Sequence, residues 1–457
     1  MTTNDLNGFF YPQTIALIGA TDKPTRPGRA ILENLAQFTG RVFAVNPKYQ
    51  TLFGKPCYAS VGELPETVDL AIIALPAARV EREITALGEK GVKRIIIVSA
   101  GFAEAGPEGI QLQARIAAAA KHFNIRVIGP NALGLFNADN GLDSFFVSRE
   151  RVSIPMAGRL SIISQSGAIA VILTEALSRD GIGVAKVVNY GNRLDVDDAD
   201  ALDYFADDPK TAAVAVYLES VADGAKFLQA AKRFVAKKPL VIWKAGKHDM
   251  GAVAVRSHTA TLAGRYGLYR AAIRQSGAAE ASGFDHMIDA AKALALMDYP
   301  CVGNRLLIVT NGGGMAVAAA DQAGYDGFTM PRAPEALQET LRHAFPSFFV
   351  TSNPIDITGS GRDEDYYTAL KEALPYYDAA VVILLMGTTT VTEGVTEMVA
   401  RACHEAKKPV TCCMLQGLGY TREAMSLLLR RGIPVYPSPE RAVRALATLK
   451  KTATCKG

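Results

Sequence analysis

Cysteine is scarce and without a pattern in this sequence of 457 residues. Its six cysteines include no CxxC pair, and zinc ribbons and thioredoxin-like redox sites are built on such pairs. Reduced thiols that pack as small core side chains are therefore the expected role of these residues. We accordingly assign no metal ligands in the chain.

Long runs of one kind of side chain are also missing. No apolar stretch reaches the roughly 18 residues that cross a bilayer, and the stretch 379–386 has the length of a buried strand. Residues 1–10 lack the regions of a signal peptide. The net charge is only +4, without a long run of Lys or Arg. We therefore expect no membrane or nucleic-acid partner, and we expect the cytoplasm as the location.

The residues that are abundant predict an α/β protein. Apolar residues make up 49% of the chain, charged residues 21%, and glycine occurs 40 times, which is typical of a well-packed globular protein. Apolar runs alternate with helical patterns, as in parallel sheets covered by helices on both faces. The first run begins at Thr14 and ends at Gly19. Further strands are predicted at 42–45, 70–75, 94–99, 126–128, 159–163, 183–189, 213–218, 239–244, 305–310, 379–386, 409–415 and 433–436.

The length predicts three domains at roughly 100–200 residues each. Residues 1–150 are predicted to form a Rossmann-like domain. Residues 151–299 and 300–457 are predicted to form two flavodoxin-like domains, because 160–170 and 307–316 both read as a strand, a small-residue loop and a helix start. Stretches with Pro and Gly at 154–158 and 299–303 separate the three segments.

Three loops in this pattern suit the binding of phosphate. They are Gly19-Ala-Thr21, Ser164-Gln165-Ser166-Gly167 and Asn311-Gly312-Gly313-Gly314. The first N–H groups of a helix lack partners within the helix, and the helix dipole is positive there, so an anion is stabilised at that end. A glycine after a strand is often only a turn residue. Three such loops in three predicted domains favour a protein that handles a phosphate-bearing ligand and a transferable phosphoryl group.

The first loop departs from the dinucleotide fingerprint. After Gly19 the next glycine is Gly28, which weakens NAD or FAD as the ligand. The longer loop carries Lys23, Arg26 and Arg29, which could meet a more anionic ligand such as coenzyme A. Solvated surface cations are the alternative, and we favour it for Lys23.

His258 is the histidine whose surroundings make it most available for chemistry. It lies in Arg256-Ser-His-Thr-Ala-Thr-Leu-Ala-Gly264, which we predict to be a flexible loop of small residues. A neutral imidazole nitrogen can attack phosphorus, and the other nitrogen needs an acceptor that fixes the tautomer. Glu219, after the predicted strand 213–218, is a candidate for that acceptor. A hydrogen-bonded loop histidine without catalytic use is the alternative, and local composition alone favours it.

Ordered motifs along nearly the whole chain resemble those of NDP-forming acyl-CoA synthetases, relatives of succinyl-CoA synthetase. The motifs are Gly19-Ala-Thr, Asn46-Pro-Lys48, Gly101-Phe-Ala-Glu104, Ile128-Gly-Pro-Asn131, Ser164-Gln-Ser-Gly-Ala168, Gly191-Asn192, Tyr217-Leu-Glu219, Lys244-Ala-Gly246, Ser257-His-Thr259, Thr310-Asn-Gly-Gly-Gly314 and Asn353-Pro-Ile-Asp356. The resemblance implies a CoA-binding Rossmann-like domain followed by two ligase domains.

The resemblance also implies roles for single residues. His258 matches the phosphorylated histidine of the family, and Glu219 matches the acid that orients it. The phosphate would lie against two helix starts, formed by Ser164, Gln165, Ser166 and Gly167 and by Gly312, Gly313 and Gly314. The contacts with CoA would come from Gly19, Thr21, Lys48, Pro76 and Asn131.

The implied reaction is acid–CoA ligation by way of phosphohistidine and acyl phosphate, with cleavage of NTP to NDP. No ATP-grasp domain is evident, so the resemblance implies a β-type partner subunit that carries ATP and Mg²⁺ in a hetero-oligomer. A CoA-binding scaffold or regulatory protein without activity is the alternative. A nicotinamide-dependent oxidoreductase is disfavoured, because Asn46-Pro-Lys48 occurs where an acid would bind ribose.

The segment Gly141-Leu-Asp-Ser-Phe-Phe-Val147 departs from the family pattern near the expected acyl site. The acid therefore need not be acetate, and larger aliphatic, aryl or dianionic acids stay open. Arg149 and Arg151 could meet a second negative charge. Solvent-exposed arginines are the alternative that we favour.

Overall fold

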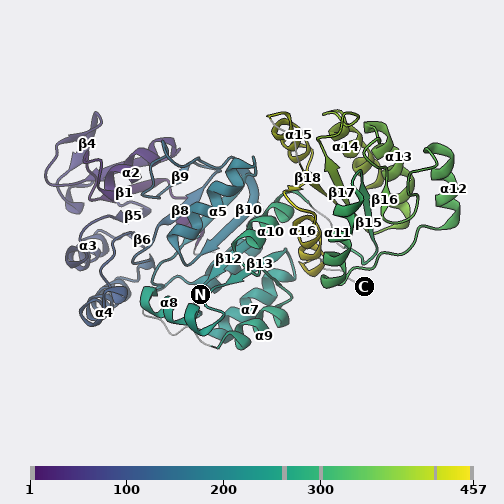
Figure 1. Ribbon diagram of the computed structural model, residues 1–457. Helices are drawn as coiled ribbons and strands as arrows, with labels where there is room; N and C mark the ends of the chain where they lie inside the picture. Colours follow the sequence, from purple (N-terminus) through teal and green to yellow (C-terminus); the bar gives the residue numbers. More distant parts are fainter. Residues whose placement is uncertain (1–5, 260–264, 298–301, 416–418, 453–457) are drawn as a thin grey trace. The chain divides into compact units, whose positions relative to one another are not determined.

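The computed structural model describes residues 6–259, 265–297, 302–415 and 419–452 (Figure 1), with the backbone alone for 255–259 and 419–420. The described residues form three sheets with helices around them. The predicted α/β class with parallel sheets is confirmed. Within the described ranges, the structure has no helix whose length and apolar character would let it span a membrane.

The first sheet has the strand order β3-β4-β2-β1-β5-β6-β7. All its pairings are parallel except that of β3 with β4. Without β3, this is the order of a doubly wound dinucleotide-binding sheet, in which ligands bind where the order reverses, next to the first strand. The strands are β1 (Thr14–Ile18), β2 (Arg41–Val45), β3 (Thr51–Leu52), β4 (Lys55–Tyr58), β5 (Leu70–Ile73), β6 (Arg94–Ile97) and β7 (Arg126–Ile128).

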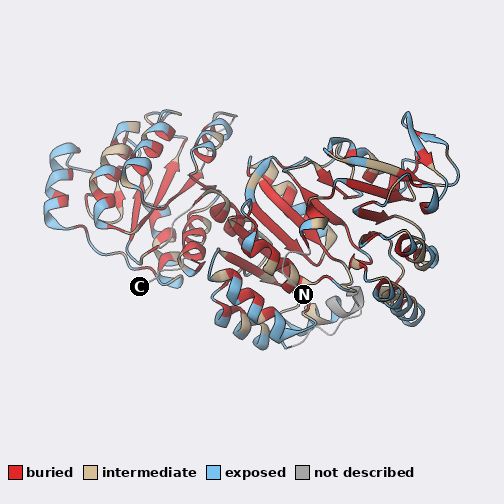
Figure 2. Ribbon diagram, turned by 180° about the vertical axis from the view of Figure 1, so that it is seen from behind, coloured by how far each residue is buried: buried red, intermediate tan, exposed pale blue. Residues whose placement is uncertain are grey.

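The helices of the first segment bury apolar stripes against this sheet. In α3, Val80, Ile84 and Leu87 recur at intervals of four and three residues and are fully buried. The central strands β1 and β5 are fully buried, whereas the outer faces of α3 and α4 are exposed (Figure 2). The helices are α1 (Asn7–Phe10), α2 (Pro27–Asn34), α3 (Ala77–Glu89) and α4 (Pro107–His122), with short 3₁₀ turns η1 (Leu35–Gln37), η2 (Val61–Glu63) and η3 (Ala103–Ala105).

The second sheet has the order β14-β13-β12-β10-β11-β8-β9. Five strands are parallel, whereas β8 runs antiparallel to β11 and to β9. The strands are β8 (Gly134–Asn137), β9 (Leu142–Asp143), β10 (Ala157–Ser164), β11 (Val184–Asn189), β12 (Ala213–Leu218), β13 (Leu240–Lys244) and β14 (Ala279–Glu280). The helices are α5 (Gly167–Arg179), α6 (Asp198–Asp207), α7 (Gly224–Val235), α8 (Asp249–Thr259) and α9 (Tyr266–Ser276).

The first two sheets share one hydrophobic core. Residues up to Arg179 and Gly183–Glu280 form one compact unit, and a single buried cluster includes strand residues of both sheets. At its centre the Phe10 ring stacks on Tyr204, with 4.8 Å between the ring centroids. The loops at the ends of both sheets therefore belong to one packed body.

The third sheet belongs to the other compact unit, formed by Asp180–Ile182 and residues from Ala281 onward. Its order is β16-β15-β17-β18-β19, and all its pairings are parallel. The strands are β15 (Leu306–Thr310), β16 (Ile355–Asp356), β17 (Ala379–Leu385), β18 (Val410–Leu415) and β19 (Val435–Tyr436). The helices are α10 (Phe284–Leu296), α11 (Gly313–Tyr325), α12 (Glu335–Ala344), α13 (Asp363–Ala373), α14 (Val395–Ala406), α15 (Gly419–Arg430) and α16 (Pro439–Thr452), with the 3₁₀ turn η4 (Leu374–Tyr376).

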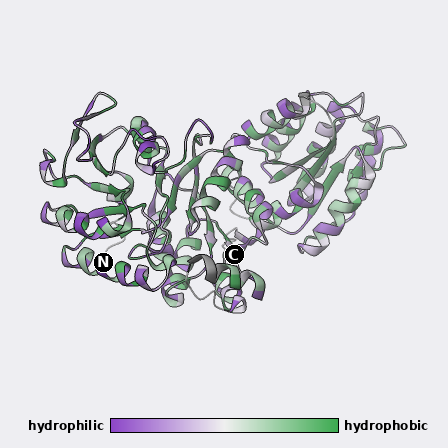
Figure 3. Cartoon of the chain, turned by 60° about the vertical axis from the view of Figure 1, so that its left-hand side comes forward, coloured by the Kyte–Doolittle hydropathy of each residue, from purple (hydrophilic) through white to green (hydrophobic). Residues whose placement is uncertain are grey.

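Helix α10 packs on α16 of this unit, where Arg441 donates to both carboxylate oxygens of Asp289 at 2.7 and 2.8 Å. The strands of each sheet are apolar and the surrounding helices are mixed, as the hydropathy colours show (Figure 3). The predicted domain limits of 1–150, 151–299 and 300–457 stay a prediction. Of the linker predicted at 299–303, only 302–303 lie among the described residues.

Candidate functional site

The Ser164–Gly167 loop joins the end of β10 to the start of α5, as predicted. The Ser164 hydroxyl donates to the Ser166 carbonyl at 2.7 Å, and Asn189 donates to the Ser164 carbonyl at 2.8 Å. Ser164 is fully buried, whereas Ser166 and Gly167 are half-buried. The Ser164 side chain thus shapes the loop, and the half-buried helix start is the part that an anion can reach.

Gln165 links this loop to the end of β12. Its side-chain oxygen accepts from the backbone N–H groups of Glu219 and Ser220 at 2.9 and 3.0 Å, and its amide donates to the Ser220 hydroxyl at 3.2 Å. Glu219 is 4% exposed and accepts from the Tyr217 hydroxyl at 3.3 Å. The structure therefore brings the predicted phosphate loop and the predicted orienting acid together.

A buried lysine lies beside Glu219. Lys244 ends β13, its position pairs with Leu218 of β12, and its side chain is inaccessible to solvent. Its ammonium donates to the Ala245 carbonyl and lies 4.4 Å from the centroid of the Tyr269 ring. Burial lowers the pKa of Lys244 to about 8, although the Glu219 carboxylate opposes this shift. A buried carboxylate and a buried ammonium of opposite charge therefore lie at the ends of the neighbouring strands β12 and β13.

The backbone of His258 is helical. It lies near the end of α8 (Asp249–Thr259), so the prediction of a loop at this residue was wrong. The alanines and straight-chain residues before it favour a helix. Its side chain lies outside the described residues, as do residues 260–264. Helix α8 is in contact with η3 of the first segment.

The Gly312–Gly314 loop repeats the same design in the other unit. Gly312 caps the start of α11, and its N–H donates to the Thr310 hydroxyl at 2.9 Å. Asn311 joins the loop to β17, since it accepts from the Leu385 N–H at 2.8 Å. Gly313 lies against Asp356: a Cβ atom there would come within 2.7 Å of the carboxylate, whereas one at Gly314 would meet nothing within 4 Å.

The predicted coenzyme residues follow neighbouring strands of the first sheet. Gly19 comes after β1, Lys48 after β2 and Pro76 after β5, at the edge where the strand order reverses. The Thr21 hydroxyl lies 3.0 Å from the Tyr49 hydroxyl and accepts from the Lys23 N–H at 3.3 Å. Lys48 and Pro76 are exposed. These positions share one edge, although Thr21 is only 7% exposed.

The three cationic side chains of the first loop differ in their exposure and in their contacts. Lys23 and Arg26 are exposed. Arg29 instead donates to the Asp22 carbonyl at 2.8 Å, pairs with Glu33, and stacks over the Phe53 ring at 4.5 Å. Arg29 therefore supports the loop that follows Gly19.

Asn131 lies at the junction of the first two sheets. It has a left-handed φ of 55° and donates to the Asn192 side chain at 3.4 Å. Asn192 in turn donates to Glu104 at 2.5 Å, and Glu104 accepts from the Gly101 N–H at 2.6 Å. These contacts connect the coenzyme side of the first sheet to the loop after β11.

Arg149 differs from its prediction as an exposed residue. Its guanidinium pairs with Asp143, its side chain is 13% exposed, and it lies over the Phe136 and Phe145 rings. Burial raises the pKa of the Asp143 carboxyl, although Arg149 opposes this shift. Arg149 is thus bound within the protein, whereas Arg151 is exposed as expected.

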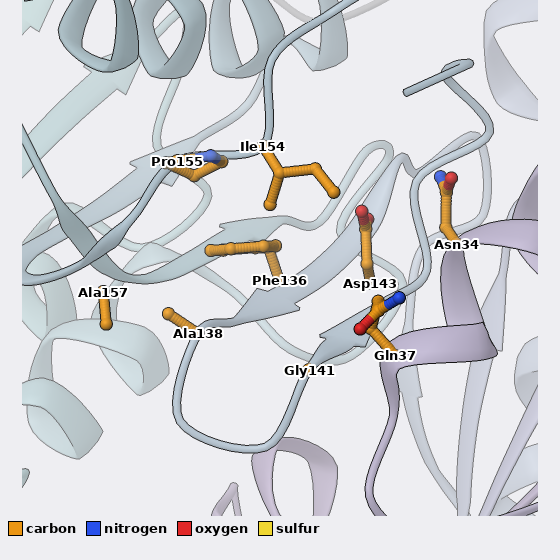
Figure 4. Close-up of a pocket in the computed structure, with 9 residues that line it drawn as sticks. All are labelled: Asn34, Gln37, Phe136, Ala138, Gly141, Asp143, Ile154, Pro155 and Ala157. Atoms are coloured by element: carbon orange, nitrogen blue, oxygen red, sulfur yellow. The ribbon is translucent and has the colours of Figure 1, made fainter. Parts of the chain in front are cut away.

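Residues of the 141–147 segment line a small cavity of about 110 Å³. Apolar side chains lie on one side of it and the polar side chains of Asn34, Gln37 and Asp143 on the other (Figure 4). It lies toward the starts of β10 and β11, where Ala157 and Lys186 are found, whereas Ser164 and Asn189 mark their far ends. This cavity therefore does not open at the phosphate loop.

Sequence reasoning missed how the loop residues are used. It did not predict that the Gln165 side chain accepts from the N–H groups at the end of β12. It passed over Arg193, although this residue follows Gly191-Asn192 of a family motif and ends up nearly buried beside Ser220. A cation next to a Gly-Asn turn was the available signal.

Three family models match the chain in order. A CoA binding domain covers residues 13–138, a succinyl-CoA ligase-like flavodoxin domain 157–294, and a Ligase-CoA domain 306–455. These matches confirm the predicted order of a CoA-binding domain and two ligase domains.

Relatives with named activities match over almost the whole chain. The α subunit of ADP-forming acetate–CoA ligase I from Pyrococcus furiosus is 36% identical over 99% of this chain and 98% of its own. ADP-forming acetate–CoA ligase I from Archaeoglobus fulgidus is 38% identical over 96% of this chain, which spans 62% of that relative's length. Acetyl-coenzyme A synthetase 1 of Candidatus Korarchaeum cryptofilum, solved with phosphate and ADP, superposes with a TM-score of 0.91 at 36% identity, covering 98% and 97% of the two chains.

Proposed function

The chain belongs to the family of ADP-forming acyl-CoA synthetases, and from that premise we propose that it is the α-type subunit of an acid–CoA ligase. The reaction joins a carboxylic acid to coenzyme A while a nucleoside triphosphate is cleaved to the diphosphate and phosphate. One observation carries this proposal. The buried carboxylate of Glu219 is fixed next to the Ser164–Gly167 helix start, in the same compact unit as the helix that bears His258.

His258 is the phosphoryl carrier in this proposal. One imidazole nitrogen attacks the γ-phosphorus of the nucleotide and the diphosphate leaves. The phosphoryl group then passes from that nitrogen to a carboxylate oxygen of the acid, which gives an acyl phosphate. The CoA sulfur attacks the acyl carbon, phosphate leaves, and the thiol proton is lost to solvent. Each step is reversible, because a phosphoramidate, an acyl phosphate and a thioester are all activated species.

Glu219 and the two helix starts assist this transfer. A carboxylate that accepts from one imidazole N–H leaves the other nitrogen unprotonated for attack, and it stabilises the ring as charge develops. The N–H groups at Ser166–Gly167 are oriented donors for the phosphoryl oxygens, and the start of α11 at Gly313–Gly314 offers donors of the same kind in the other unit. Such preorganised donors act without further rearrangement during transfer.

Coenzyme A binds the first domain in this proposal. Gly19 and Thr21 lie where the strand order reverses, with Lys48, Pro76 and Asn131 around the same edge. Lys48 and Asn131 are exposed, so their side chains are accessible to the diphosphate and the pantetheine amides of the coenzyme.

The nucleotide and Mg²⁺ bind a β-type partner with an ATP-grasp domain in this proposal. The P. furiosus relative that matches this chain over 98% of its length is named as an α subunit. A hetero-oligomer of both chains is the catalytic form in this proposal.

Reconstitution tests this proposal. The purified chain is assayed alone and with its candidate ATP-grasp partner, against a panel of aliphatic, aryl and dianionic acids with CoA and ATP. We expect the chain alone to bind CoA and to form no acyl-CoA, and the pair to form acyl-CoA and ADP. Full activity of the chain alone would refute the partner requirement, and inactivity of the pair on every acid would favour a CoA-binding scaffold.

A further inference from the structure

We propose that Arg193 is a positioning residue for phosphoryl transfer, which fixes the turn carrying Glu219 and ties it to the coenzyme side of the first sheet. This inference rests on the proposed function, because it assigns a task to a residue of the same site.

The Arg193 guanidinium forms two hydrogen bonds to Ser220, the residue that follows Glu219. One nitrogen donates to the Ser220 carbonyl at 2.6 Å, and another donates to the Ser220 hydroxyl at 2.9 Å. The Arg193 side chain is only 6% exposed and Ser220 is 1% exposed. A planar fork with two donors holds its target in one orientation, which the single ammonium of a lysine cannot do.

Gln165 holds the same turn from the phosphate loop. It accepts from the backbone N–H groups of Glu219 and Ser220 and donates to the Ser220 hydroxyl. The Ser220 hydroxyl is therefore the meeting point of Gln165 and Arg193. The turn that presents Glu219 is bound on one side by the loop at the start of α5 and on the other by the loop after β11.

The backbone of the Arg193 loop is bonded to the residues before Asn131. The Asn192 N–H donates to the Pro130 carbonyl and the Leu194 N–H to the Gly129 carbonyl, each at 2.9 Å. Gly191 packs so closely that a Cβ atom would lie 2.3 Å from the carbonyl oxygens of Pro130 and Asn131. Arg193 therefore joins the Glu219 turn to the segment that ends in a proposed coenzyme residue.

Folding alone gives a poor reason for this arrangement. Arg193 has a left-handed φ of 56°, a conformation that is unfavourable for a residue other than glycine. Its carboxylate partner, Asp198, is buried and stays 3.7 Å away. Burial, and then the Asp197 carboxylate, raises the pKa of Asp198 to about 7, although the Arg193 charge opposes this shift. Strained residues with buried charge persist mainly where they serve a site.

The test measures phosphohistidine formation in the complex of this chain with its ATP-grasp partner. Arg193→Met removes the fork, and Arg193→Lys keeps the charge with one donor group. The rate of protein phosphorylation is measured by rapid quench. It is divided by the concentration of folded protein, which is determined from the stoichiometry of CoA binding. Arg126→Met is the matched control, because the Arg126 guanidinium near the same loop pairs with Asp195 and Asp200.

We expect Arg193→Met to lower the phosphorylation rate at least tenfold at saturating ATP and to change the Kd for CoA less than twofold. Arg193→Lys should regain part of the rate, and Arg126→Met should keep it within twofold. A wild-type rate in Arg193→Met or, should that variant not fold, in Arg193→Lys overturns the inference. Wild-type protein that takes up no phosphate overturns the proposed function itself, and this inference with it.

Discussion

At the scale of single residues, the site depends on charges that water barely reaches. Glu219 is 4% exposed and Lys244 is fully buried beside it. Interactions between such groups are stronger than at the surface, and each is costly to leave without its counterpart. The two residues therefore allow separate tests of catalysis and of stability.

Glu219→Gln should slow phosphorylation of His258 in the reconstituted complex by about 100-fold, because a neutral amide neither fixes the tautomer nor stabilises the developing imidazolium charge. Rapid-quench measurement of acid-labile phosphate checks this. Glu280→Gln is the control, since Glu280 on β14 is separated from β12 by one strand, pairs with Lys247 and accepts from the Tyr266 hydroxyl. Equal rates in Glu219→Gln and in the wild type would remove Glu219 from the mechanism.

Lys244 should make stability depend on pH in the alkaline range. Its pKa is about 8 in the folded chain and 10.5 ordinarily. Between these values the unfolded chain binds more protons, so wild-type stability rises with pH there, and below pH 8 the cost of the buried charge is complete. That rise amounts to at most about 3 kcal/mol.

Lys244→Met should lack this rise, so its free energy of unfolding relative to the wild type should fall as the pH increases from 8 to 10.5. Denaturant unfolding of both proteins at several pH values measures the difference. Parallel curves for the two proteins across this range would contradict the assignment of the low pKa to Lys244.

At the scale of elements, periodicity predicted most strands of the parallel sheets to within two residues. Leu70–Ile73 and Ala379–Leu385 are continuous apolar runs, which only a doubly covered sheet buries on both faces. These elements were predictable because their patterns are local.

The antiparallel additions were not predicted, because their patterns are too short. β8 and β9 span four and two residues and join the second sheet only through tertiary pairing with β11. The helical backbone at His258 was missed because small hydroxylated residues follow it. For the candidate site, the glycines and the order of the motifs predicted the loops. The hydrogen bonds of Gln165 and Arg193 to the Glu219–Ser220 turn were not predictable, because they join residues about 30–55 positions apart in the sequence.

The start of α2 offers a test of the coenzyme loop as an element. Gly28 packs against the loop after β1, and a Cβ atom there would lie 2.1 Å from the Gly19 carbonyl oxygen. Gly28→Ala should push this loop out of place and weaken CoA binding at least tenfold in calorimetric titration. Gly62→Ala is the control, because its new Cβ atom meets only the Ser60 hydroxyl at 3.6 Å. Unchanged affinity in Gly28→Ala would place CoA elsewhere.

At the scale of the whole molecule, the chain consists of two compact units, the first of which contains two sheets around a common core. Phe10 contributes to that core by stacking on Tyr204 and packing against Phe205. Phe10→Ala should destabilise this unit by about 3–5 kcal/mol. Amide hydrogen exchange should become faster in both β1 and β12, whereas exchange in β17 of the other unit should stay unchanged. Loss confined to the first sheet would contradict a shared core.

The central claim is that the chain carries phosphate on His258 during acyl transfer. The most direct measurement incubates the complex of this chain and its ATP-grasp partner with ATP and Mg²⁺, then locates phosphate on the α-type chain by mass spectrometry under alkaline conditions. We predict one acid-labile phosphate on His258. It should disappear when the carboxylic acid substrate and CoA are added, and it should be absent from His258→Asn. Phosphate that persists in His258→Asn, or acyl-CoA formation by that variant at the wild-type rate, would contradict the account.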